Sequence, residues 1–227
     1  VMLGHQDTLS VTMDEMIHHV KAVRRGAPDS FVVADMPYLS YHISVEESVK
    51  NAGRFIQEGR ANAVKLEGGQ DFSDVIKAVL RAQIPVVGHL GLTPQSVNAF
   101  GGYKVQGKLK EDVERLIDDA LVLQALGVSA IVLECIPPDV AKHVTKLLKI
   151  PTIGIGAGGD VDGQVLVFHD ALGLYDRLKP KFVKAFAQGH QVLLQGLTDY
   201  VDTVKNKSFP DKDHQFASTD LDLEHLY

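Results

Sequence analysis

Five ionisable side chains lie at or near the ends of short apolar runs in this sequence. Asp35 follows the run FVVA, Glu67 follows AVKL, His89 follows PVVG and Glu134 follows AIVL. Lys65 lies two residues before Glu67, so on an extended strand both side chains point to the same face. Such a set could hold a hard cation such as Mg²⁺ and move a proton beside it.

Each of these residues has a functional and a structural interpretation. Asp35 and Glu67 could bind one divalent cation together, or each could cap a helix or pair with a lysine. Lys65 could bind a substrate carboxylate or a developing oxyanion, or form an ion pair with Glu67. Glu134 follows four apolar residues, and partial desolvation there raises its pKa and suits a general base near neutral pH. His89 could be a site residue or a hydrogen-bonded structural histidine.

The apolar runs are expected to be strands of a parallel sheet. They are nearly continuous in hydrophobicity, which suits strands covered on both faces, and helical patterns lie between most of them. Alternation of this kind predicts βαβ units. The expected strands are residues 31–34, 63–66, 85–88, 129–133, 152–155 and 164–168. The expected helices are residues 13–25, 45–58, 72–82, 111–126, 138–148, 180–188 and 191–205.

The polar strand ends distinguish between two α/β folds. An open doubly wound sheet takes its ligand groups from few strands, whereas a barrel collects one side chain from each of many strands at one mouth. Four consecutive polar ends therefore favour a (β/α)8 TIM barrel, with these runs as strands 3 to 8 and the first two strands upstream of Val1. We expect one barrel domain over residues 1–205 and an irregular tail over residues 206–227.

Two glycine-rich segments and the cysteine are given structural roles. The segment GIGAGG (154–159) resembles a dinucleotide-binding fingerprint, but DVDGQ follows it instead of the apolar start of a helix. We expect a tight loop there between the last two strands. The segment FGGYKVQGK (100–108) is typical of a mobile loop that could act as a lid. Cys135 should pack on the face opposite Glu134 and is not marked as a nucleophile.

Composition excludes several classes of protein. The 227 residues carry a net charge of −6 and no long basic run, which argues against a nucleic-acid partner. No stretch approaches the roughly 18 consecutive apolar residues of a membrane helix. The single cysteine cannot form an internal disulfide, which fits a reducing compartment. We expect a cytoplasmic protein without nucleic-acid or membrane partners that handles anions at one local site.

Longer segments resemble those of the ketopantoate hydroxymethyltransferase family. They are, in the family order, GHQDTLSVT, RRGAP, VVADMPYLSY, AVKLEGG, VVGHLGLTPQSVNAFGGYKVQGK, LECIPP, IGIGAG, DGQVLVFHDALGL and SFPDKDHQF. The resemblance implies a barrel of the phosphoenolpyruvate/pyruvate superfamily. The resemblance to this family implies the transfer of a hydroxymethyl group from 5,10-methylenetetrahydrofolate to 3-methyl-2-oxobutanoate, which forms 2-dehydropantoate for pantothenate biosynthesis. The resemblance also implies a homo-oligomer, a decamer by family analogy.

The same resemblance implies a role for each candidate residue. Asp35 would bind Mg²⁺ and substrate, Glu67 would bind Mg²⁺, Lys65 and His89 would contact substrate, and Glu134 would be the general base. The reaction would pass through a Mg²⁺-stabilised enolate. The family also has a Gly-Asp-Ser segment that supplies a further metal ligand and a substrate contact, and that segment is not among these 227 residues.

Two alternative functions stay open at this point. Another metal-dependent lyase or aldolase of the same superfamily would use the enolate with a different electrophile and would not depend on folate. A non-catalytic nucleotide-binding or assembly module would bind no 2-oxo acid in a Mg²⁺-dependent way. The sequence that follows GIGAGG counts against this second alternative.

Overall fold

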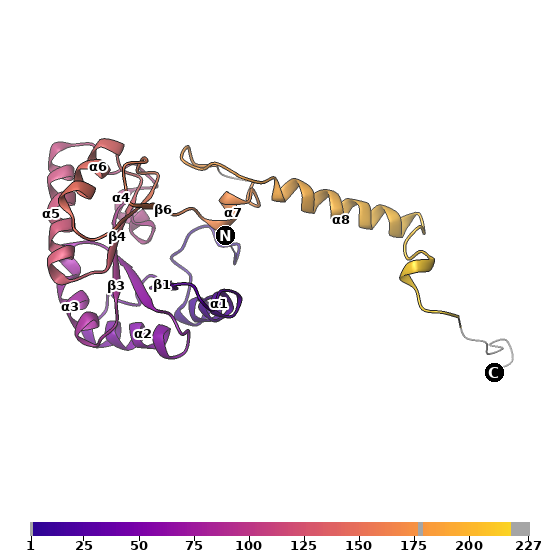
Figure 1. Cartoon of the computed structure of the whole chain (residues 1–227), viewed down its shortest axis with the longest axis horizontal. Helices are drawn as coiled ribbons and strands as arrows, with labels where there is room; N and C mark the ends of the chain where they lie inside the picture. Colours follow the sequence, from indigo (N-terminus) through magenta and orange to yellow (C-terminus); the bar gives the residue numbers. More distant parts are fainter. Residues whose placement is uncertain (1, 177–178, 219–227) are drawn as a thin grey trace. The chain divides into compact units, whose positions relative to one another are not determined.

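The computed structural model describes residues 2–176 and 179–218. Contacts within the chain divide it into two compact units, Val1–Leu166 and Val167–Tyr227 (Figure 1). All the strands of the described residues lie in the first unit. The contact boundary thus falls at Leu166, and the single barrel domain expected over residues 1–205 with a tail over 206–227 stays a prediction.

The first unit is built on a parallel six-stranded sheet. Its strands pair in the order in which they follow one another along the chain, and every pair is parallel. This is the order of consecutive strands in a (β/α)8 barrel. Five of the predicted strands are confirmed, four of them with shifted ends, but of the sixth, expected over 164–168, only Gln164 lies in a strand, and Phe168 begins a helix. The strands are β1 (Val33–Asp35), β2 (Ala63–Glu67), β3 (Val86–Gly91), β4 (Ala130–Glu134), β5 (Thr152–Ile155) and β6 (Gly163–Gln164).

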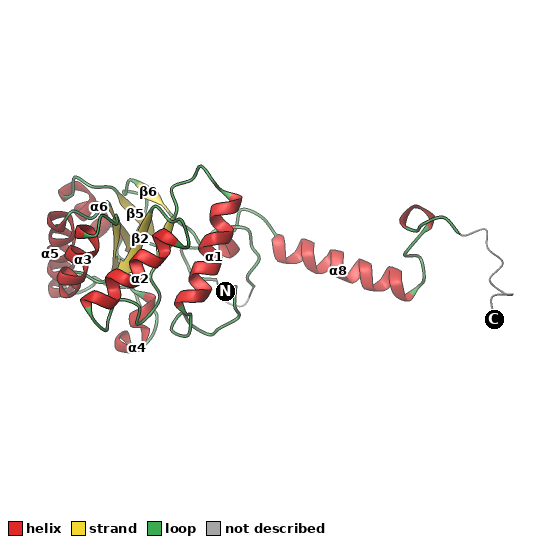
Figure 2. Ribbon diagram, turned by 90° about the horizontal axis from the view of Figure 1, so that it is seen from below, coloured by secondary structure: helices red, strands yellow, loops and turns green. Residues whose placement is uncertain are grey.

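Within the first unit, helices connect each of the first four strands to the next and cover the outside of the sheet (Figure 2), whereas a loop joins β5 to β6. In the ranges that the structure describes, every helix is too short or too polar to cross a lipid bilayer. The helices are α1 (Met13–Gly26), α2 (Val45–Gln57), α3 (Ser73–Arg81), α4 (Val97–Phe100), α5 (Lys110–Leu126), α6 (Pro138–Leu147), α7 (Phe168–Ala171) and α8 (Gly189–Lys205). Short 3₁₀ turns are η1 (Gln70–Phe72), η2 (Pro94–Ser96) and η3 (Lys212–His214).

One predicted helix, over residues 180–188, is wrong. This segment is irregular because amides in and just after it bond to the C-terminal end of α7 and the residue that follows it, instead of to carbonyls four residues back. Phe186 N donates to Ala171 O at 2.8 Å, and Gly189 N donates to Leu172 O at 2.9 Å. Tertiary pairing has therefore overridden the local helix propensity of the segment. The other expected helices are confirmed with boundaries shifted by one or two residues.

Local sequence sets where the helices begin and end. Thr12 and Glu15 form a capping box at the start of α1, and the Ser44 side chain accepts from Glu47 N at the start of α2. Gly127 ends α5 in the left-handed conformation, with a φ of 97°. The expected loop at GIGAGG is also confirmed, because it connects β5 to β6.

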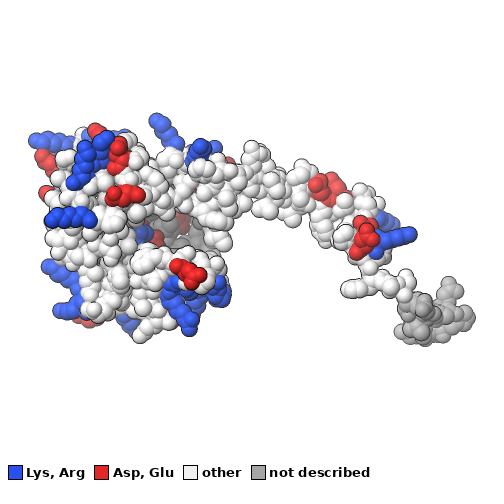
Figure 3. Space-filling model, viewed as in Figure 1, with Lys and Arg blue, Asp and Glu red and all other residues white. Residues whose placement is uncertain are grey.

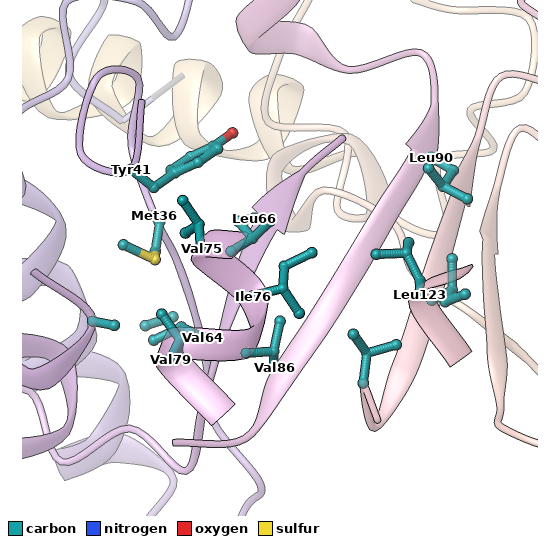
Figure 4. Close-up of a cluster of buried hydrophobic side chains, with 14 of the residues drawn as sticks. Met36, Tyr41, Val64, Leu66, Val75, Ile76, Val79, Val86, Leu90 and Leu123 are labelled. Carbon is teal, nitrogen blue, oxygen red and sulfur yellow. The ribbon is translucent and has the colours of Figure 1, made fainter. Parts of the chain in front are cut away.

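The core lies between the sheet and the helices that cover it (Figure 4). Leu66 and Val86 on the strands and Ile76 on α3 are completely buried, as is Leu123 on α5. Burying one such side chain contributes about 1.5–3 kcal/mol to stability. Because side chains alternate along a strand, burial of Leu66 against the helices turns its two neighbours on β2 to the other face of the sheet.

Gly91 provides a test of the close approach between β3 and β4. It pairs with Glu134 in register, has a φ of 94°, and a Cβ there would lie 2.2 Å from Glu134 O. We expect Gly91→Ala to lower the free energy of unfolding by about 1–3 kcal/mol, measured by urea denaturation. Gly53→Ala on α2 is the matched control, because a Cβ there meets no atom within 4 Å. It should raise stability by about 0.5–1 kcal/mol. Equal effects of the two changes would contradict the packing at Gly91.

Candidate functional site

The five candidate residues meet at the carboxyl end of the sheet. Lys65 Nζ lies 2.8 Å from Asp35 Oδ1, 3.9 Å from Glu67 Oε1 and 3.2 Å from His89 Nδ1. On its other side, His89 Nε2 lies 3.2 Å from Glu134 Oε2. The structure therefore brings together every residue that the sequence singled out, in one continuous set of polar contacts that we call the site cluster.

Strand register explains why these side chains meet. Asp35 on β1 lies opposite Lys65 on β2, and Glu67 on β2 lies opposite His89 on β3. Lys65 and Glu67 share a face because they are two residues apart on one strand. Glu134 follows on β4, so four adjacent strands contribute to the site cluster. A parallel sheet presents all these ends at the same edge, where barrel enzymes place their active sites.

Lys65 is the cation at the centre of the cluster. Its side chain is only 16% exposed, whereas Glu67 is 5% exposed. Burial acts to lower the pKa of Lys65, but the negative charges of Asp35 and Glu67 outweigh it and raise the pKa above its usual value. The ammonium group therefore stays charged at neutral pH, held by the carboxylates beside it.

The two buried glutamates and the histidine have shifted pKa values. Burial raises the pKa of Glu67 to about 7 and that of Glu134 to about 7, although the Lys65 charge acts in the opposite direction on both. Burial and the Lys65 charge lower the pKa of His89 to about 3, so its ring is neutral. Since Lys65 donates to Nδ1, the ring proton lies on Nε2, the nitrogen nearest Glu134. Glu134 is thus a carboxyl group that can change protonation near neutral pH.

Two residues that the sequence did not mark hold Glu67 in place. Gln95 N donates to Glu67 Oε2 at 3.0 Å, and the Gln95 side chain donates to Met36 O at 2.8 Å. Tyr41 Oη donates to Gln95 Oε1 at 3.0 Å and accepts from Glu67 N at 3.2 Å. Both residues are buried, Tyr41 in the loop after β1 and Gln95 in the 3₁₀ turn η2, so only a three-dimensional arrangement reveals them. The segments MPYLSY and LTPQS carried no chemical motif that would single them out.

Asp35 and Glu67 offer a pair of hard oxygen ligands for Mg²⁺. Asp35 Oδ1 is buried and has no hydrogen bond of good geometry from the described residues, although Lys65 lies 2.8 Å away. A group of three or more His, Cys, Asp or Glu arranged around one metal position is absent from the part of the chain that the structure describes. Mg²⁺ is commonly held by one or two carboxylates together with substrate oxygens and water, so the pair fits the ion.

The neighbouring thiol and loop have limited roles in this geometry. Burial raises the pKa of Cys135 to about 11, so the thiol is protonated and a poor nucleophile at neutral pH. The backbone of Cys135 accepts a hydrogen bond from Gln106 N at 2.9 Å, which attaches the loop 101–109 to the end of β4. Burial and the charges of Asp7 and Glu134 raise the pKa of Tyr103 in this loop. Its action as a lid stays a prediction.

Solved structures share this fold at low sequence identity. The chain resembles a phosphonopyruvate hydrolase solved with oxalate and Mg²⁺, with a TM-score of 0.55, 11% identity and coverage of 93% of this chain and 74% of that one. It also resembles a putative phosphonomutase from Burkholderia cenocepacia, with a TM-score of 0.51, 14% identity and coverage of 86% and 79%. The predicted fold class is confirmed: the parallel sheet with its covering helices resembles the α/β TIM-barrel fold of these structures.

Sequence comparison identifies the family. Residues 1–212 match the model of the family described as ketopantoate hydroxymethyltransferase. The 3-methyl-2-oxobutanoate hydroxymethyltransferase of Clostridium botulinum is 55% identical over the whole chain, which covers 82% of that relative. The relative of the same description from Enterococcus faecalis is 54% identical with the same coverage. The chain belongs to the ketopantoate hydroxymethyltransferase family.

Proposed function

We propose that this chain transfers a hydroxymethyl group from 5,10-methylenetetrahydrofolate to 3-methyl-2-oxobutanoate at the site cluster. Family membership makes it a 3-methyl-2-oxobutanoate hydroxymethyltransferase of pantothenate biosynthesis. The observation that carries the assignment of roles is the position of His89, which contacts the Lys65 cation through one nitrogen and Glu134 through the other. A proton acceptor, Glu134, and a fixed positive charge, Lys65, thus lie on either side of one neutral ring.

Lys65 and Asp35 would bind the substrate from the β1 and β2 side. The Lys65 ammonium can pair with the carboxylate or the keto oxygen of a 2-oxo acid, and it is already held in place by its carboxylate neighbours. Mg²⁺ held by Asp35 and Glu67 would supply a Lewis acid for negative charge on the substrate oxygens. The low exposure of Glu67 and Lys65 excludes most water, which strengthens these interactions.

Glu134 would remove the proton from C3 of the substrate. The C3–H bond breaks, its electron pair forms the enolate, and Lys65 offsets the charge that develops on oxygen. C3 then forms a bond to the one-carbon unit of the folate, and water supplies the hydroxyl oxygen as tetrahydrofolate leaves. Neutral His89 lies beside the Glu134 carboxylate, with Nε2 3.2 Å from Glu134 Oε2 and without a hydrogen bond of good geometry from the described residues.

Replacement of Glu134 tests its role as the base. We expect Glu134→Gln to slow exchange of the C3 proton of 3-methyl-2-oxobutanoate in D₂O with Mg²⁺ by at least about 100-fold, because the amide cannot accept the proton. Proton NMR without folate measures this step alone. Glu114→Gln on the exposed face of α5 is the matched control and should exchange at the wild-type rate. Exchange retained by Glu134→Gln would overturn the assignment.

The pH dependence of the same exchange provides an independent test. A general base acts in its deprotonated form, and burial raises the pKa of Glu134 to about 7. The exchange rate should therefore rise about tenfold per pH unit below pH 7 and level off above it. Parallel measurement of circular dichroism separates a change in rate from a change in folding. A rate that falls as the pH rises from 6 to 8 would contradict a carboxylate base with this pKa.

We also propose that the chain forms a homo-oligomer, a decamer by family analogy. Helix α8 exposes a stripe of large apolar side chains that includes Leu193, Leu197, Tyr200 and Val204. These positions are three or four residues apart and therefore share one face of the helix. Charge on α8 is confined to its C-terminal half (Figure 3). Exposed apolar surface of this extent is typical of a protein interface.

Sedimentation velocity tests the role of this face. Wild-type protein should sediment as an oligomer, and Leu197→Glu should shift it to smaller species, because association would bury an unpaired charge. Gln191→Glu adds the same charge to a polar position of α8 and is expected to leave the oligomer intact. A monomeric wild-type protein, or equal behaviour of the two variants, would contradict assembly through this face.

A further inference from the structure

A cavity of about 360 Å³ lies beside Glu67. Its walls come from the loop that follows β1, from the start of the loop after β2, and from η2 and α4. A second cavity, of about 270 Å³, shares Gly68, Phe72 and Ser96 with it but is lined by none of the site cluster. The first cavity therefore adjoins the proposed reaction centre, and we call it the Glu67 cavity.

Aromatic rings form one wall of the Glu67 cavity. The ring centroid of His42 lies 4.0 Å from that of Tyr41, 5.4 Å from that of Tyr38 and 5.2 Å from that of Phe72. Burial lowers the pKa of His42, so this ring is neutral and adds no charge to the wall. The rings pack on one another, and Tyr41 is buried, but Tyr38 and His42 are exposed, so these two rings can present a surface on which a ring system stacks.

Amide groups provide polar contacts in the same cavity. Gln95 lies at its buried end beside Glu67, and Asn98 lies at its exposed end. The Asn98 side chain makes no hydrogen bond with other described residues. The Gln95 amide already bonds to Met36 O and Tyr41 Oη, so the Asn98 amide is the group left to donate to and accept from a heterocycle whose edge alternates N–H and C=O groups.

We propose that the Glu67 cavity binds the reduced pterin ring of the folate co-substrate. This inference rests on the proposed function, because the one-carbon donor has to reach a substrate bound at the site cluster. A cavity that shares Glu67 with the cluster satisfies this requirement, and its volume lies within the usual range for small-molecule sites. The pterin is an uncharged heterocycle whose ring can stack on the aromatic wall of the cavity and whose amide-like edge can bond to the amide group there.

Calorimetric titration of tetrahydrofolate into the full chain, with 3-methyl-2-oxobutanoate and Mg²⁺ present, tests the proposal. Tyr38→Ala and His42→Ala should each weaken binding by about fivefold to tenfold, because each removes one stacking face. Tyr38→Phe keeps the ring and should bind within about twofold of wild type. Phe31→Ala, another exposed aromatic outside the cavity, is the matched control. Tyr38 is 38% exposed, so its truncation should leave folding intact.

Steady-state kinetics add a second readout. The same alanine variants should raise KM for 5,10-methylenetetrahydrofolate and leave KM for 3-methyl-2-oxobutanoate within about twofold. Wild-type affinity in both alanine variants would overturn the Glu67 cavity as the pterin site. Weakened binding in Asp119→Asn, at the second cavity, with none in Tyr38→Ala would place the pterin there instead. C3 exchange by wild-type protein without folate tests the proposed function separately, because that half-reaction needs no pterin.

Discussion

The ammonium group of Lys65 is the interaction on which the site depends. Two carboxylates at neighbouring strand ends repel each other when both are charged and shielded from water. Lys65 Nζ lies within 4 Å of both, at 2.8 Å from Asp35 and 3.9 Å from Glu67, and offsets that repulsion. Its own burial is tolerated only because these partners compensate for lost hydration. The fold thus holds a positive charge between two carboxylates. A 2-oxo acid would bring a negative charge to the lysine, and a divalent ion would bring a positive charge to the carboxylates.

His89 lies between the Lys65 ammonium group and the Glu134 carboxyl group. Burial lowers the pKa of His89 and keeps its ring neutral. The ring contacts Lys65 with Nδ1 and Glu134 with Nε2, and it adds no second positive charge to the site. Glu134 consequently feels Lys65 only at a distance, and burial outweighs that attraction in setting its pKa to about 7. The pKa of Glu67, which lies 3.9 Å from Lys65, is also raised to about 7, so burial outweighs the lysine charge at both glutamates. In the proposed mechanism, β1 and β2 supply the groups that bind substrate and metal, and β4 supplies the base.

The sequence predicts the site cluster because alternation along strands and the common edge of a parallel sheet are local rules. Asp35, Glu67, His89 and Glu134 each end an apolar run, and those runs pair in chain order. These local rules do not predict Tyr41 and Gln95, because the two residues come together only through the pairing of β1, β2 and β3. The helix prediction for residues 180–188 fails for the same reason, because the Phe186 amide bonds to Ala171 O outside the segment. What depends on non-local hydrogen bonds is not encoded in periodicity.

The loop network also connects the two proposed substrate positions. Gln95 donates its backbone N–H to Glu67 Oε2 and lines the Glu67 cavity, while its side chain bonds to Met36 O just beyond β1. The same short segment therefore fixes a proposed metal ligand and one end of the proposed pterin site. Any displacement of η2 would change both at once, so neither site can be adjusted without the other. In the proposed arrangement, the Glu67 carboxylate lies between the two ligands, so that donor and acceptor would meet at one strand end.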